Sequence, residues 1–174
     1  MTERLLLVGM MAVGKTTVGQ LCAKRLGWSF LDSDAQLLSD TGRTAQEIFD
    51  ADGDEELRIL EGRALVEAVA RDEPVVVAVA GGVVLSDANR ELLMRSGVVV
   101  WLRASIETLI GRVPHGGVRP RLGVDPAQSL RDLYRERLPL YAEVAAFVID
   151  VDDLAPDEVV ARIFEAAGLG GSEP

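Results

Sequence analysis

One segment of the chain combines glycines, a lysine and a threonine at the spacing of a phosphate-binding loop. Residues 9–16, Gly-Met-Met-Ala-Val-Gly-Lys-Thr, match the pattern G-x-x-x-x-G-K-[ST] between an apolar run and an amphipathic one. In such a loop the backbone amides cradle the β-phosphate, the lysine bridges the β- and γ-phosphates, and the threonine hydroxyl ligates Mg²⁺. The competing interpretation is a plain glycine turn. The segment predicts binding of ATP and Mg²⁺ by Gly9, Met10, Met11, Ala12, Val13, Gly14, Lys15 and Thr16, with Thr17 in the first helical turn.

Two carboxylates stand where the next predicted strand ends. Asp32 and Asp34 follow the apolar run of residues 29–31. The carboxyl ends of parallel strands meet at the crevice that holds ligands, so both carboxylates are expected near a bound metal. The alternative is that Asp34 caps a helix that starts at Ala35.

Arginines gather in the second half of an otherwise acidic chain. The net charge is −10, which argues against general nucleic-acid binding, yet residues 112–137 contain six arginines and only three acids. A solvated helix face is one explanation, and an anion site is the other. The six arginines are Arg112, Arg119, Arg121, Arg131, Arg135 and Arg137.

Composition narrows the class of protein. The 174 residues suit one domain, and no apolar run approaches the roughly 20 residues of a membrane span. The apolar run at residues 5–8 is too short for a signal peptide, so a cytoplasmic location is expected. The single cysteine, Cys22, is expected to be a buried structural thiol.

Strand-like and helical patterns alternate along the chain. This alternation predicts a three-layer α/β/α fold with a central parallel sheet of about five strands. The predicted strands are residues 4–8, 29–31, 75–79, 98–102 and 147–151. The predicted helices are residues 15–26, 44–49, 54–69, 87–95, 105–111, 156–167, and 126–141 with a disturbance at Pro139. A single domain over residues 1–170 is expected, followed by a frayed tail at 171–174.

The segment 112–125 fits no regular element. A loop of this length in a compact domain is uncommon and is often a functional lid. It contains His115, which is expected to be mobile and solvated rather than catalytic.

Taken together, these motifs resemble the shikimate kinase family over residues 4–165. The matching segments, in order, are Gly9–Thr17, Asp32–Asp34, Thr41–Arg43, Ile48–Phe49, Gly53, Leu57–Arg58 with Glu61, Gly81–Gly82, Arg119–Pro120 and Arg137–Tyr141. The resemblance implies a nucleoside-monophosphate-kinase-like fold and ATP-dependent phosphorylation of shikimate to shikimate 3-phosphate in aromatic amino-acid biosynthesis. It further implies a monomer that acts on a small molecule, with neither a nucleic acid nor a membrane as partner.

The resemblance also implies roles for individual residues. Lys15, Asp34 and Arg119 would be catalytic: Arg119 would reach in from the lid, and Asp34 would bind the acceptor hydroxyls and take the proton. Thr16 and Asp32 would serve the Mg²⁺ ion. The acceptor-binding region would span about residues 33–62, and the acceptor would contact Asp34, Phe49, Arg58, Glu61, Gly81, Gly82 and Arg137. The adenine would lie against Arg112, Arg119 would also touch the nucleotide, and the loop 152–156 with Pro156 would edge the base.

The match departs from the family pattern at four positions. They are Ala45, Leu57, Ala80 and Arg121. The first two are expected to leave more room around the acceptor, so a related cyclitol or polyhydroxy acid is an alternative substrate. A nucleoside monophosphate acceptor would be repelled by Asp34. A protein that binds a nucleotide without catalysing a reaction, and regulates a partner, is the non-enzymatic alternative.

Overall fold

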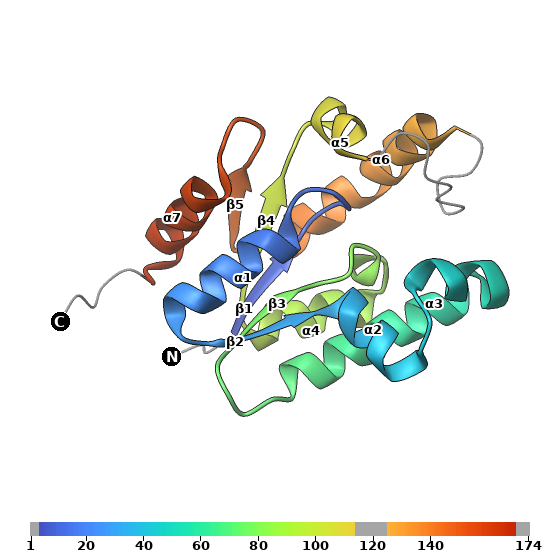
Figure 1. Cartoon of the computed structure of the whole chain (residues 1–174), viewed down its shortest axis with the longest axis horizontal. Helices are drawn as coiled ribbons and strands as arrows, with labels where there is room; N and C mark the ends of the chain where they lie inside the picture. The colour runs from blue at the N-terminus through green and yellow to red at the C-terminus, as the bar shows by residue number, and fades with distance from the viewer. Residues whose placement is uncertain (1–3, 114–124, 170–174) are drawn as a thin grey trace.

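The central layer of the protein is a five-stranded parallel sheet (Figure 1). The computed structural model describes residues 4–113 and 125–169. The strands lie in the order β2-β3-β1-β4-β5, which confirms the predicted parallel α/β sheet. Their bounds are β1 Arg4–Val8, β2 Ser29–Asp32, β3 Val75–Ala78, β4 Val98–Arg103 and β5 Phe147–Asp150.

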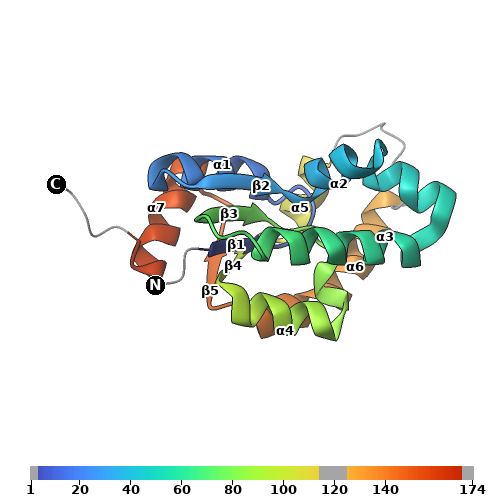
Figure 2. The ribbon, with the colours of Figure 1, turned by 90° about the horizontal axis from the view of Figure 1, so that it is seen from below.

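Helices cover both faces of the sheet (Figure 2). Helices α1 (Lys15–Leu26) and α7 (Pro156–Ala167) contact each other on one face, and α4 (Asp87–Ser96) and α6 (Pro126–Val144) pack against β4 on the other. The remaining elements are α2 (Ser33–Thr41), α3 (Ala45–Val69), the 3₁₀ turn η1 (Val83–Leu85) and α5 (Ile106–Arg112). Within residues 4–113 and 125–169, no helix combines the length and the apolarity that crossing a bilayer would need.

The main core is formed by strand side chains between the two helical layers. Leu5, Leu6 and Leu7 of β1 are at most 1% exposed, as expected for a strand whose two faces are both covered. Cys22 of α1 is fully buried in the same core, and burial raises the pKa of its thiol to about 12. This confirms the prediction of a buried structural thiol.

A second, smaller core lies between α2 and α3. Leu37, Ile48 and Leu57 are its buried members. Ala45, Phe49 and Leu60 pack against them. This region is therefore held together by contacts of its own, apart from those of the main sheet.

Helix α6 continues past the point where the sequence predicted a disturbance. Pro139 lies inside the helix, which extends to Val144. The ring is on the exposed side, whereas Arg137 and Tyr141 are buried on the opposite side. Packing of that buried side maintains the helix despite the hydrogen bond that proline cannot donate.

Helix α3 is interrupted at Gly53. This residue has φ 89° and ψ 178°, a backbone region that is essentially restricted to glycine. The predicted helices 44–49 and 54–69 are thus two helical pieces on either side of one non-helical residue.

We expect Gly53→Ala to lower the free energy of unfolding by about 1–3 kcal/mol, because alanine is strained in this backbone conformation. A Cβ atom at Gly53 would meet no atom within 4 Å, so the effect would come from the backbone alone. Gly111→Ala is the matched control: that position is also open but helical, and alanine should stabilise it by up to about 1 kcal/mol. Urea unfolding of the two variants should show opposite signs, and equal changes would contradict the explanation.

Candidate active site

The phosphate-binding loop connects the end of β1 to the start of α1. Gly9, Ala12 and Gly14 have positive φ angles of 147°, 63° and 107°. Such turns direct successive backbone amides to the inside of a loop, where they bind anions. The ammonium group of Lys15 donates hydrogen bonds to the carbonyls of Gly9 at 2.8 Å and Met10 at 3.0 Å, which holds it at the same loop.

Lys15 also indicates which other charges share this cleft. Burial lowers the pKa of its ammonium group to about 8, against the attraction of Asp34 and Asp32. Arg137 lowers the pKa further by repulsion, and Glu61 raises it. The side chains that were predicted from four separate segments are therefore close enough to act on one lysine.

Asp32 is joined to the phosphate-binding loop directly. The hydroxyl of Thr16 donates to Oδ2 of Asp32 at 2.6 Å. The Oδ1 atom of Asp32 accepts hydrogen bonds from the backbone N–H groups of Asp34 at 2.9 Å and Ala35 at 3.3 Å. Asp32 is thus the N-cap of α2, and the proposed capping role of Asp34 was wrong. Asp34 lies in the first turn of α2, close enough to Lys15 for its carboxylate to raise the pKa of the ammonium group.

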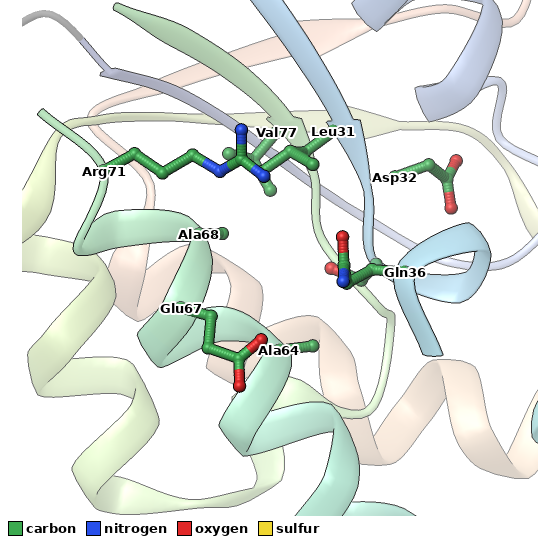
Figure 3. Close-up of a pocket in the computed structure, with 9 residues that line it drawn as sticks. Leu31, Asp32, Gln36, Ala64, Glu67, Ala68, Arg71 and Val77 are labelled. Carbon is green, nitrogen blue, oxygen red and sulfur yellow. The ribbon is translucent and has the colours of Figure 1, made fainter. Parts of the chain in front are cut away.

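A cavity of about 90 Å³ lies beside Asp32, between the edge strand β2 and helix α3 (Figure 3). Ala64 and Ala68 line it with small side chains, and Gln36, Glu67 and Arg71 surround it. In Figure 3 the Asp32 carboxylate points away from these residues. Its hydrogen bond to Thr16 therefore assigns Asp32 to the phosphate-binding loop.

Arg58 is held by carboxylates on two sides. Its Nη1 donates to the buried Glu61 at 2.6 Å, and its Nη2 donates to Asp54 at 2.7 Å, with Nε also facing Asp54 at 3.4 Å. Burial alone would lower the pKa of Arg58, but Glu61 and Asp54 raise it. Within residues 4–113 and 125–169, one N–H group on each of Nη1 and Nη2 is left without a partner, a pair suited to a carboxylate. The contact with Glu61 was predicted; Asp54 was missed, although its spacing of four residues from Arg58 was a usable signal.

Gly82 borders this ion pair closely. A Cβ atom built at Gly82 would lie 1.7 Å from Arg58 Nη1 and 2.7 Å from Glu61 Oε2. The backbone angles of Gly82, φ −84° and ψ −11°, are open to any residue. Only the space requires glycine here, since any side chain would displace Arg58.

Arg137 enters the same cleft from α6. It is 3% exposed, and its Nε is a buried donor that has no partner among the described residues. A Cβ atom at Gly81 would lie 3.4 Å from Arg137 Nη1 and 3.4 Å from the Gly9 carbonyl oxygen. Arg137, the glycine pair and the phosphate-binding loop therefore meet at one place. A buried donor without a partner costs free energy, which sets Arg137 apart from an ordinary core residue.

The other predicted site residues lie around the rim or outside the described part of the chain. Arg112 donates from Nη1 to the Val13 carbonyl at 3.3 Å, so it borders the phosphate-binding loop. Pro156, the last residue of the predicted loop 152–156, is the first residue of α7. Phe49 packs on the small core beside Leu57. Some predicted features lie outside the described residues 4–113 and 125–169. They are Arg119, His115, Arg121, most of the segment 112–125 and the tail 171–174.

The arrangement suits transfer of a phosphoryl group to a small organic acid. The loop and Lys15 can bind phosphates, Thr16 and Asp32 offer the oxygen groups that Mg²⁺ prefers, and two arginines can bind a carboxylate. In the part of the chain that the structure describes, no three His, Cys, Asp or Glu side chains form a metal cage.

Comparison with known proteins identifies a single family. The family model described as shikimate kinase matches residues 11–167. A shikimate kinase of Symbiobacterium thermophilum is 44% identical over 164 residues, which are 92% of this chain and 94% of the relative. A shikimate kinase of Pseudomonas fluorescens is 42% identical, with 94% and 95% covered. The structure of a shikimate kinase from Acinetobacter baumannii in complex with shikimate superposes with a TM-score of 0.90 at 37% identity, covering 98% of this chain and 95% of the other.

The pKa of Lys15 leads to a prediction for nucleotide binding. We expect the affinity for a non-hydrolysable ATP analogue to fall about tenfold from pH 7.5 to pH 9, because the ammonium group loses its proton above a pKa of about 8. Titration calorimetry should also show proton uptake on binding at pH 9. Lys15→Arg is the control, since a guanidinium keeps its charge and its weaker binding should not change over this range. Affinity of the unchanged protein that is constant with pH would contradict the role of Lys15.

Proposed function

The chain belongs to the shikimate kinase family, and from this premise we propose that it transfers the γ-phosphoryl group of ATP to the 3-hydroxyl of shikimate. The single observation that carries the proposal is the meeting of the phosphate-binding loop, Arg137 and the Gly81–Gly82 backbone in one cleft, with Arg58 beside the second glycine. This cleft can hold a triphosphate and a carboxylic acid side by side.

The nucleotide would bind with its phosphates on the loop amides and Lys15. Mg²⁺, held by Thr16 and through water by Asp32, would offset charge on the phosphate oxygens. The hydrogen bond between Thr16 and Asp32 supports this, since it already brings the two oxygen groups together. Arg112 and the loop that ends at Pro156 would hold the adenine.

The acceptor's carboxylate would be bound by Arg58, Arg137 and a backbone amide of the glycine pair. Two N–H groups of Arg58 have no partner among the described residues, and Arg137 Nη1 lies beside Gly81; both observations support this assignment. Glu61 would act by orienting Arg58, and Phe49 would pack beside the ring. With the carboxylate fixed at one end, the hydroxyl groups at the other end would face Asp34.

Asp34 would accept the proton of the attacking hydroxyl. The hydroxyl oxygen forms a bond to the γ-phosphorus while the bond to the β–γ bridging oxygen breaks, and ADP leaves with that oxygen. Lys15 would stabilise the charge on the transferring group, and Arg119 would do so from the segment outside the described residues. The attraction between Asp34 and Lys15 supports a carboxylate on the γ-phosphate side of the cleft. The expected monomeric state stays a prediction.

A substrate panel tests the proposal. ADP release is measured with shikimate, quinate, gluconate and several cyclitols in parallel, and phosphorus NMR locates the phosphate on the product. We expect a large preference for shikimate and phosphorylation at its 3-hydroxyl. A preference for another acid would show that this member of the family acts on a different acceptor. ATP binding without turnover of any acceptor would identify a non-catalytic module.

The close contact at Gly82 leads to a mutational prediction. Gly82→Ala should raise KM for shikimate by about 10- to 100-fold, because the methyl group displaces Arg58 from its place beside the carboxylate. KM for ATP should change little. Gly81→Ala is the comparison: its Cβ would meet Tyr141 Oη at 3.3 Å and Arg137 Nη1 at 3.4 Å, so its effect should be clearly smaller. Steady-state kinetics that rank the two variants in the reverse order would contradict this account.

A further inference from the structure

We propose that Tyr141 is a positioning residue for the acceptor, which holds the peptide group between Gly81 and Gly82 in the orientation that binds a carboxylate. The inference rests on the proposed function and adds to it a residue that touches neither reacting group. It is carried by a hydrogen bond, by the surroundings of that bond, and by a second tyrosine on the same helix.

The hydroxyl of Tyr141 donates to the Gly81 carbonyl oxygen at 2.8 Å. Tyr141 is 1% exposed, and it lies one helical turn after Arg137 on the buried side of α6. Its ring packs against Trp101 of β4 with centroids 5.9 Å apart. Burial raises the pKa of the hydroxyl to about 12, against the attraction of Arg137, so the group stays a donor at physiological pH.

This bond acts on a turn whose other hydrogen bond lies outside the peptide group of interest. The backbone N–H of Val83 donates to the Ala80 carbonyl at 3.2 Å and closes the turn over the two glycines, while the Gly81 carbonyl is held by Tyr141. Glycine has the widest conformational freedom of any residue, so this second hydrogen bond adds to the order of the turn. A trans peptide is planar, and its carbonyl and N–H point in opposite directions. When Tyr141 holds the Gly81 carbonyl, it therefore also sets the direction of the Gly82 N–H. On the far side of Gly82 lies Arg58.

The same hydroxyl relates the acceptor side to the phosphate side. It lies 3.9 Å from the sulfur of Met10 in the phosphate-binding loop. A Cβ atom at Gly81 would come within 3.4 Å of the Gly9 carbonyl oxygen, so the two segments are packed together. A shift of the glycine pair would move the acceptor relative to the γ-phosphate, and small displacements of that kind lower rates strongly.

A packing role alone does not account for the hydroxyl. Phenylalanine would fill the same space between Trp101 and the loop without the free-energy penalty of burying a hydroxyl. Tyr134, two turns earlier on α6, provides the comparison. Tyr134 is half-buried, and its hydroxyl donates to the Ala104 carbonyl at 3.2 Å, a bond of the same type away from the glycine pair.

The test compares Tyr141→Phe with Tyr134→Phe in the full chain. Each variant keeps its ring and loses a hydrogen bond from a tyrosine hydroxyl to a backbone carbonyl; Tyr141→Phe also loses the contacts of that hydroxyl with the Met10 sulfur and the Arg137 side chain. For Tyr141→Phe we expect KM for shikimate to rise about tenfold, while KM for ATP stays within about twofold. For Tyr134→Phe both KM values should stay within about twofold. Melting temperatures of the two variants measure the structural part of each effect.

Two outcomes would overturn the proposal. One is a Tyr141→Phe variant with a lower melting temperature and unchanged KM for shikimate, which would show a purely structural bond. The other is an equal loss of affinity for shikimate and ATP, which would show general loosening of the cleft. Failure of the proposed function is recognised separately, because the unchanged protein would then show no shikimate-dependent ADP release.

Discussion

The site depends above all on the parallel pairing of β1, β2 and β3. The register places Leu7, Asp32 and Ala78 side by side, so the three strands end at the same level. Each chain segment that follows carries part of the site: the phosphate-binding loop after β1, Asp34 after β2 and the glycine pair after β3. Parallel strands present their carboxyl ends at one edge of the sheet, which is why distant segments meet there. The buried apolar side chains of these strands thereby determine the distances on which the chemistry depends.

The second requirement is that cationic groups are held in place in a protein whose net charge is −10. Arg58 is fixed by Glu61 and Asp54, and the nearly buried Arg137 places its Nη1 beside Gly81. Removing one partner of a buried charge pair is strongly destabilising, so Glu61 and Arg58 depend on each other. This fixed arrangement reduces the loss of side-chain entropy when an anion binds, because the guanidinium groups are already oriented.

Much of the fold could be predicted because its signals are local. The buried strands appear as short apolar runs, and the break in α3 at Gly53 falls within the gap, residues 50–53, between the two predicted helices. Predictions were wrong where a contact distant in sequence decided the outcome. Helix α6 continues through Pro139 because Arg137 and Tyr141 are buried on its other side. Asp32 rather than Asp34 caps α2, because the direction of the chain after β2 places the Asp32 carboxylate next to the backbone amides of the first helical turn.

The sequence by itself determined the phosphate-binding loop, the parallel α/β class and the types of side chain at the site, since these follow from spacing and periodicity along the chain. Only the tertiary structure decided which groups touch. It showed that Gly82 is required by the space beside Arg58, and that Tyr141 holds the Gly81 carbonyl. Those contacts join residues 24 and 60 positions apart, from Arg58 to Gly82 and from Gly81 to Tyr141. No local pattern encodes such distances, because they result from packing two helices onto the same end of the sheet.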